Sequence, residues 1–190
     1  MVLNTSCGTL GGNLRREEDH DHTESQTRGP RAYRGVVRRG VILGMTAPAW
    51  TGFDEAVAAY QRGDYATAIR KFRPLAEQGN AEAQFNLGIM YDNGQGFPQD
   101  DAEAVKWYRK AAEQGVAEAQ YNLGIMYDNG QGVPQDYSKA HMWFNLAASR
   151  HPPGERRDKA VKNRDIVAER MTPAQISEAQ KLAREWRPKK

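Results

Sequence analysis

Residues 81–116 read AEAQFNLGIMYDNGQGFPQDDAEAVKWYRKAAEQGV, and residues 117–152 read AEAQYNLGIMYDNGQGVPQDYSKAHMWFNLAASRHP. Aligned without a gap, the two stretches are identical at 22 of 36 positions. A repeat of this period is typical of solenoid proteins, in which each unit is a pair of helices that packs on its neighbours. The sequence therefore predicts an all-α fold, an α/α solenoid of helix-turn-helix repeats.

The first helix of each unit is predicted over residues Ala81 to Asn93, with Leu87 and Tyr91 on one buried face. Gly88 falls in the middle of this helix, where glycine costs about 1 kcal/mol relative to alanine. We therefore expect another helix to approach closely at Gly88. Gly94 then ends the helix, because glycine readily takes the left-handed conformation found at helix C-termini.

The second helix of each unit is predicted to begin after Asp100, an N-cap residue, with Glu103 completing a capping box. Small and large apolar residues alternate along one stripe of this helix, as interlocking helix faces require. In the two units these are Ala104, Trp107, Ala111 and Ala112, and then Ala140, Trp143, Ala147 and Ala148. We interpret the large aromatic residues Trp107, Trp143, Tyr91 and Tyr127 as core, and an aromatic ligand site is the alternative.

A shorter unit precedes these two. Residues 53–80 carry apolar side chains at helical spacing, and Asp64 is placed to cap a second helix after a tight turn. Ala68 and Phe72 match Ala104 and Tyr108 at the same 36-residue offset. Pro74 removes a backbone hydrogen bond late in this helix and predicts a local bend.

Residues 154–187 are helical in pattern but not repetitive. Two prolines and a glycine interrupt the array before them, and Thr172 then restarts a helix, with Gln175 as its capping-box partner. The last repeat of a solenoid leaves an apolar face open, and a more polar helix pair can cover that face. We predict that residues 154–187 form such capping helices.

Residues 1–50 are predicted to be a disordered leader, because they contain few apolar residues before position 41. His20 and His22 lie in an acidic stretch, but nothing there would fix them as metal ligands, so no metal site is expected. Residues 38–50, RRGVILGMTAPAW, resemble a short, degenerate export signal. We expect a periplasmic or otherwise exported protein, with a cytoplasmic location as the alternative.

Charge is distributed unevenly along the chain. Residues 51–152 carry 9 Lys+Arg against 13 Asp+Glu, a net charge of −4, whereas residues 153–190 carry 11 against 6, a net charge of +5. Binding to a phosphate backbone requires a positive surface, so no nucleic-acid partner is expected for the repeats. No run of residues reaches the roughly 18 apolar positions of a membrane span. The single cysteine, Cys7, excludes an intramolecular disulfide.

The repeated motif resembles the Sel-one-like repeat of the tetratricopeptide-like superfamily, in its bacterial type. The residues that carry the resemblance are Ala81, Ala83, Leu87, Gly88, Tyr91, Gly94, Gly96, Pro98, Asp100, Ala104, Trp107, Ala111 and Ala112, and again from Ala117. The unit at residues 53–80 is closer to a tetratricopeptide repeat. The resemblance implies a right-handed superhelix and a non-catalytic adaptor or scaffold that needs no cofactor.

A partner-binding face follows by analogy with tetratricopeptide repeats, whose first helices line the concave side. We call the ten residues at these positions the ladder: Glu82, Phe85, Ile89, Asp92 and Asn93 in the first unit, and Glu118, Tyr121, Ile125, Asp128 and Asn129 in the second. Apolar rungs would supply affinity, asparagines would bond a peptide backbone, and carboxylates would favour a basic or amino-terminal ligand. An ordinary exposed helix face is one alternative, and packing of Phe85 and Tyr121 between repeats is another.

Two other functions compete with a protein or peptide scaffold. A cysteine-rich branch of the resembled family includes cell-wall-directed hydrolases and penicillin-binding proteins, but no repeat here has a cysteine and no catalytic residues are predicted. His141 stands where the first unit has Val105, which favours a structural role. The other alternative is binding to an anionic surface or nucleic acid through the basic C-terminal region. Its residues are Arg156, Arg157, Lys159, Lys162, Arg164 and the tail from Arg187 to Lys190.

Overall fold

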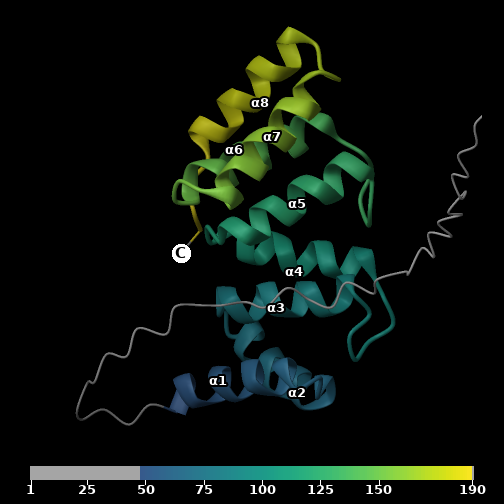
Figure 1. Ribbon diagram of the computed structural model, residues 1–190, viewed down its shortest axis with the longest axis vertical. Helices are drawn as coiled ribbons and strands as arrows, with labels where there is room; N and C mark the ends of the chain where they lie inside the picture. The colour runs from purple at the N-terminus through teal and green to yellow at the C-terminus, as the bar shows by residue number, and fades with distance from the viewer. Residues whose placement is uncertain (1–47, 190) are drawn as a thin grey trace, which may run out of the picture. The chain divides into compact units, whose positions relative to one another are not determined.

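The computed structural model describes residues 48–189, with only the backbone described at 48–51, and this part of the chain forms eight α-helices and no strand (Figure 1). Up to residue 47, the predicted leader and export signal lie outside the described residues. The helices are α1 (Pro48–Gln61), α2 (Tyr65–Glu77), α3 (Ala81–Asp92), α4 (Asp101–Glu113), α5 (Ala117–Asn129), α6 (Tyr137–Arg150), α7 (Glu155–Ala168) and α8 (Pro173–Glu185).

The helices pack in chain order. Within units α1 packs on α2, α3 on α4 and α5 on α6, and between units α2 packs on α3 and α4 on α5 (Figure 1). Each element therefore contacts its neighbours along the array, which is the arrangement of a helical solenoid. The all-α solenoid predicted from the repeat is confirmed.

Side-chain caps set the start of most of these helices. Asp64 accepts a hydrogen bond from the amide of Thr67 at 3.1 Å, and Asp100 accepts one from the amide of Glu103 at 2.9 Å. Thr172 forms the complete predicted capping box at the start of α8. Glu103 departs from its prediction, because its carboxylate pairs with Lys106 instead of reaching back to the N-cap.

The core contains the small residues and most of the large ones that the repeat pattern selects. Trp143 and Tyr127 are buried, whereas Trp107 and Tyr91 are half-buried at its edge. The ring of Tyr91 stacks on that of Phe97 with centroids 4.1 Å apart, so the loop after α3 folds back onto its own helix. Trp143 and Tyr127 are thus core residues, as the pattern predicts, whereas Trp107 and Tyr91 pack at the edge of the core.

The first unit extends further than its pattern indicates. Helix α1 begins at Pro48, whereas the repeat pattern places the start of the unit at residue 53. Helix α2 continues past Pro74 to Glu77. Pro74 is exposed, and Phe72 and Ala76 on either side of it remain in the core. The proline therefore costs a hydrogen bond near the end of α2 without removing the helix from the array.

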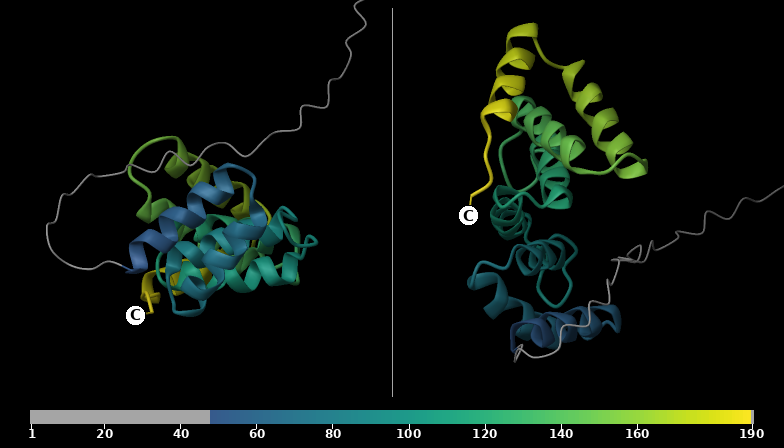
Figure 2. Two further views of the ribbon diagram at one scale, coloured as in Figure 1. Left: turned by 90° about the horizontal axis from the view of Figure 1, so that it is seen from below. Right: turned by 90° about the vertical axis from the view of Figure 1, so that its left-hand side faces the viewer.

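Helices α7 and α8 both pack against α6. They do not repeat the close pairing that α3 makes with α4 and α5 makes with α6. In the right-hand view of Figure 2 they diverge from the turn that joins them. The C-terminal pair therefore covers α6 from two sides, and a gap lined by side chains of all three helices lies between α7 and α8.

Candidate partner-binding face

The first helix of each 36-residue unit is pressed against the second at a glycine. A Cβ atom added to Gly88 would lie 2.5 Å from Cδ1 of Tyr108, and one added to Gly124 would lie 2.6 Å from Cδ1 of Phe144. Real Cβ atoms do not approach other atoms so closely. The predicted close approach at Gly88 is confirmed, and it fixes how each ladder is oriented on its unit.

Asp92 is tied into the fold by Tyr108. The tyrosine hydroxyl donates a hydrogen bond to Oδ2 of Asp92 at 3.0 Å and also bonds the side chain of Asn122. Burial raises the pKa of Asp92 above its ordinary value, although the bond from Tyr108 acts in the opposite direction. The ladder carboxylate of the first unit is therefore a half-buried group with an internal partner.

Phe85 does not face a groove. Its side chain is only 5% exposed and packs near Tyr108, with ring centroids 5.9 Å apart. Tyr121, its counterpart, is half-buried beside Phe144, with centroids 5.6 Å apart. Both aromatic rungs thus pack against the second helix of their own unit, whereas the alternative placed them between repeats. The reason is that their long side chains reach the adjacent helices instead of pointing away from them.

The remaining ladder residues differ in the solvent exposure of their side chains. Glu82, Asn93 and Asn129 are exposed, whereas Ile89 and Ile125 are half-buried against the main core cluster. Only part of each isoleucine is therefore free to meet a ligand.

In the second unit, three side chains from α7 and the turn after it contact ladder residues. Arg156 pairs with Glu118 at 2.7 Å, Nδ2 of Asn163 donates to the Tyr121 hydroxyl at 3.0 Å, and Arg170, just after α7, pairs with Asp128 at 3.1 Å. These three partners are spaced seven residues apart, which is close to two helical turns, so they face the same way. The second ladder is thus occupied by a basic segment of the chain itself.

Sequence reasoning missed two glutamines that join the units. Nε2 of the buried Gln84 donates to the carbonyl of Ala76 at 2.9 Å, and Nε2 of Gln120 donates to that of Ala112 at 3.1 Å. Each glutamine thereby satisfies a carbonyl near the end of the preceding helix. The signal was present in the repeated A-x-A-Q motif, where a polar residue recurs at a buried position.

The basic C-terminal region is partly neutralised by internal pairs. Among its predicted surface-binding residues, Arg156 pairs with Glu118, Lys159 with Glu155 and Arg164 with Asp165. Lys189 in the tail pairs with Glu113. Arg157 and Lys162 are exposed. The positive face is therefore smaller than the net charge of the region indicates.

Two of the four histidines lie in the part of the chain that the structure describes. His141 and His151 are both buried, at 3% and 9% exposure, and His20 and His22 lie outside the described residues. Within residues 48–189 no group of three or more His, Cys, Asp or Glu side chains is arranged to hold a metal ion. In the same part of the chain, no helix combines the length and apolar character that crossing a membrane requires.

The Sel1 repeat family matches residues 81–116 and 117–151. A protective antigen present in uropathogenic Escherichia coli strains, which displays an SLR fold, is 32% identical with a TM-score of 0.66; the match covers 73% of this chain and 29% of the antigen. A Sel1 repeat protein from Oxalobacter formigenes is 34% identical with a TM-score of 0.54, over 63% of this chain and 89% of that protein. No curated protein matches the chain.

The protein belongs to the Sel1 repeat family. It spans less than a third of the length of the antigen, but it corresponds to nearly the whole of the Oxalobacter protein. Sel1 repeats form a scaffold fold, in general non-catalytic, that serves protein–protein interaction. Both similar structures are bacterial, in agreement with the bacterial type that the motif resembles.

Proposed function

We propose that the protein is a non-catalytic scaffold that binds a basic segment of a partner protein on the ladder. The repeat architecture supports a protein-binding role. The ladder supports a basic ligand, because it combines carboxylates, asparagines and half-open isoleucines on an array with a net charge of −4 over residues 51–152. A guanidinium or ammonium group approaching such a surface is attracted over several ångströms.

One observation carries this proposal. The second ladder already holds a basic segment, through two arginine–carboxylate pairs and an amide–hydroxyl bond. The first ladder has the same residues at four of its five positions, with Phe85 in place of Tyr121, and Glu82 and Asn93 are exposed there. Charge-assisted pairs of this kind give orientation as well as affinity. An arginine of a partner segment would find the open carboxylate of Glu82 on the first ladder, with Asn93 as a further hydrogen-bonding group.

Affinity capture from the native host tests this proposal. The triple variant Glu82→Lys/Asn93→Ala/Asn129→Ala changes exposed ladder residues only, so its fold should persist. A Glu82→Lys change reverses one charge, and Glu77→Lys makes the same change on the exposed face of α2 as a matched control. We expect a partner identified by mass spectrometry to be lost with the triple variant and kept with the control.

The ladder isoleucines are less suitable probes, because Ile89 and Ile125 contact the core and a glutamate there would also lower stability. A captured protein should next be tested in purified form by calorimetry. Binding that is unchanged in the triple variant, with the fold intact by circular dichroism, would exclude the ladder as the binding face.

We also propose that the protein acts after export, which rests on the sequence of residues 38–50 alone. Fractionation of the native host, with detection by an antibody, tests it. Recovery from the periplasmic or extracellular fraction is expected, and recovery with cytoplasmic marker enzymes alone would contradict export.

A further inference from the structure

A cavity of about 370 Å³, open to solvent on one side, lies between α6, α7 and α8, and no ladder residue lines it. This volume lies in the range of small-molecule sites in proteins. Its lining is mostly polar and consists of His141, Asn145, Arg164, Asp165, Ala168, Ile176, Gln180 and Arg184.

Three helices each turn a short row of side chains toward the cavity. On α8, Ile176, Gln180 and Arg184 follow each other at four-residue spacing, so they share one face. A different face of α8, with Ala179 and Ala183, is buried. Helix α8 is therefore anchored by its small residues while its polar row lines the cavity.

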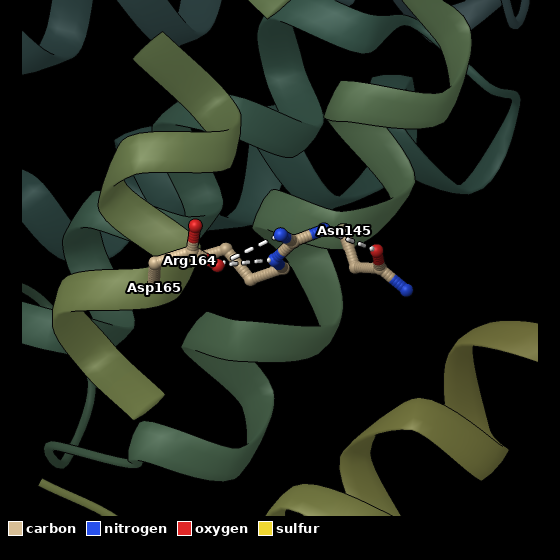
Figure 3. Close-up of polar contacts among 3 residues, drawn as sticks. All are labelled: Asn145, Arg164 and Asp165. Atoms are coloured by element: carbon tan, nitrogen blue, oxygen red, sulfur yellow. Dashed lines mark hydrogen bonds and ion pairs between the residues drawn. The ribbon is translucent and has the colours of Figure 1, made fainter. Parts of the chain in front are cut away.

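Arg164 on α7 is held in place at the wall of the cavity. Its Nε and Nη2 atoms donate to Oδ1 of Asp165 at 2.9 and 2.7 Å, and its Nη1 donates to Oδ1 of Asn145 on α6 at 3.4 Å (Figure 3). The guanidinium thus bridges two helices, and its orientation is fixed before any ligand arrives. Such preorganisation lowers the entropic cost of binding.

His141 contributes a buried polar atom that lacks a partner. The side chain is 3% exposed, and within residues 48–189 its Nδ1 atom has no hydrogen bond. The preceding repeat has Val105 at this position, where an apolar side chain packs in the core. Buried polar groups are normally hydrogen-bonded, so the enclosed Nδ1 of this cavity-lining imidazole has hydrogen-bonding capacity that the fold itself does not use.

The row on α8 is also free to bind. Among the described residues, the side chains of Gln180 and Arg184 are exposed and make no hydrogen bond or ion pair. Arg164 and Arg184 together outweigh the single carboxylate of Asp165, so the cavity carries one excess positive charge while His141 is neutral. Guanidinium groups match the planar fork of a carboxylate.

We propose that the cavity between α6, α7 and α8 binds a carboxylate group of a monoanionic ligand, with Arg184 and His141 as its principal contacts. Ile176 and Ala168 would contact the apolar remainder of the ligand. The carboxylate could belong to a free small acid or to the C-terminus of a peptide, and the two sources share the same recognition chemistry.

Binding should depend on pH. The charged and titratable groups lining the cavity are His141 on α6, Arg164 and Asp165 on α7, and Arg184 on α8. Burial, and next Arg164, lower the pKa of His141 in the free protein. A carboxylate bound beside His141 would raise its pKa, so binding takes up a proton and affinity increases as pH falls.

Nuclear magnetic resonance of the histidine side chains in the full chain tests the proposal. The probes are N-acetylglycine, its uncharged amide, and an acetylated pentapeptide with either a free or an amidated C-terminus. We expect saturable shifts of the His141 signals with both free acids and none with either amide. His151, buried but outside the cavity, serves as internal control. Affinity at pH 5.5 should exceed that at pH 7.5 by at least threefold.

Two variants separate a built site from general charge attraction. Arg184→Ala should weaken binding at least tenfold, and Arg157→Ala, which removes an exposed charge on α7 outside the cavity, should leave it unchanged. His141→Val, which introduces the residue of the preceding repeat, should remove the pH dependence. Tenfold tighter binding of the peptide than of N-acetylglycine would identify a chain terminus as the source, and equal affinity would identify a free acid. No saturable shift with either acid, or equal loss in Arg157→Ala, would overturn the proposal.

Discussion

The two Sel1 repeats share 22 of 36 residues, yet their second helices meet different surroundings. In α4, Lys106, Arg109 and Lys110 are exposed. The matching residues of α6 are Met142, Asn145 and Leu146, which are half-buried or buried. Three cations have thus been replaced by neutral side chains on the helix that the basic pair α7 and α8 covers. Outside the contact between the glycine and the aromatic ring in each unit, the residues that differ between the repeats adapt the second repeat to its contacts with α7 and α8.

The conserved part of the repeat keeps the helix-to-helix contact, and the variable part selects the neighbour. Gly88 and Gly124 admit an aromatic ring in both units. The ring is Tyr108 in the first unit, where its hydroxyl bonds Asp92, and Phe144 in the second, where that hydroxyl is absent. Asp128 consequently pairs with Arg170 instead. The tyrosine hydroxyl therefore decides the partner of the aspartate: Asp92 bonds Tyr108 within its own unit, whereas Asp128 pairs with Arg170, just after α7.

The largest loss of stability should come from adding a side chain to the glycine at the contact between the two helices of a unit. Gly88→Ala places a Cβ atom against the Tyr108 ring, and overpacking should cost about 3 kcal/mol of unfolding free energy despite the better helix propensity of alanine. Gly124→Ala should cost less, because Phe144 has no hydroxyl bond to hold its ring in place. Urea unfolding followed by circular dichroism measures both. Equal costs would show that the hydroxyl does not fix the ring.

Exchanging the ring itself should have a smaller effect. Tyr108→Phe gives the first unit the residue of the second and removes the hydrogen bond to Asp92, which should cost about 1 kcal/mol at pH 7. The loss should be accompanied by a further rise in the pKa of Asp92, measurable by carboxyl-carbon titration. Phe144→Tyr is the matched control. A pKa of Asp92 that does not move would mean that burial alone sets it.

The second repeat has His141 where the first has Val105, and this difference predicts that the free energy of unfolding depends on pH. Because burial lowers the pKa of His141 below its ordinary value of 6.5, the folded state binds fewer protons than the unfolded state below that pH. The unfolding free energy should therefore fall as pH drops from about 6.5, and His141→Val should reduce this loss by roughly 1 kcal/mol. Thermal melts at pH 7.5 and 5.5 measure it. The remaining dependence should include His151, whose pKa is lowered by burial as well. Identical melts of wild type and variant across this range would contradict the assignment.

The sequence predicts the regular part of the molecule well, because there each residue is constrained by local geometry. The mid-helix Gly88 and the caps at Asp64 and Thr172 follow from rules that act within one turn or one helix contact. Phe85 was misplaced because a helical position does not reveal how far a long side chain reaches toward the next helix. The contact of Asn163 with Tyr121 spans 42 residues between segments that share no pattern, so no period could indicate it.

The sequence did not predict the cavity either, because segments that share no repeat pattern form it. It depends on α7 and α8 diverging over α6, and this angle is set by packing of non-repeated residues. Its one sequence signal was the histidine at the position of Val105, which the pattern alone assigns to structure. Repetition therefore predicts what the units share and is uninformative about what covers the last of them.

The smallest effects on stability are expected from replacing Asp92 or Asp128, and these two changes distinguish the units most directly. Residues 87–96 and 123–132 are the same ten residues, LGIMYDNGQG, so Asp92 and Asp128 have identical local sequences. Asp128→Asn should destabilise the protein by a few tenths of a kcal/mol, because it removes a partly exposed pair with Arg170. Asp92→Asn should be neutral or slightly stabilising, since burial raises the pKa of Asp92 and the amide oxygen can still accept from Tyr108.

Salt separates these two carboxylates further. The cost of Asp128→Asn should shrink toward zero in 1 M salt, where exposed pairs are screened, whereas the effect of Asp92→Asn should hardly change. Urea unfolding at low and high salt measures both variants against Asp54→Asn, a change at an exposed position of α1 outside both ladders. Equal effects at both aspartates would mean that the local sequence sets their environment. Effects of opposite sign would mean that α7 and Arg170 set the environment of Asp128, because these segments contact the second ladder and not the first.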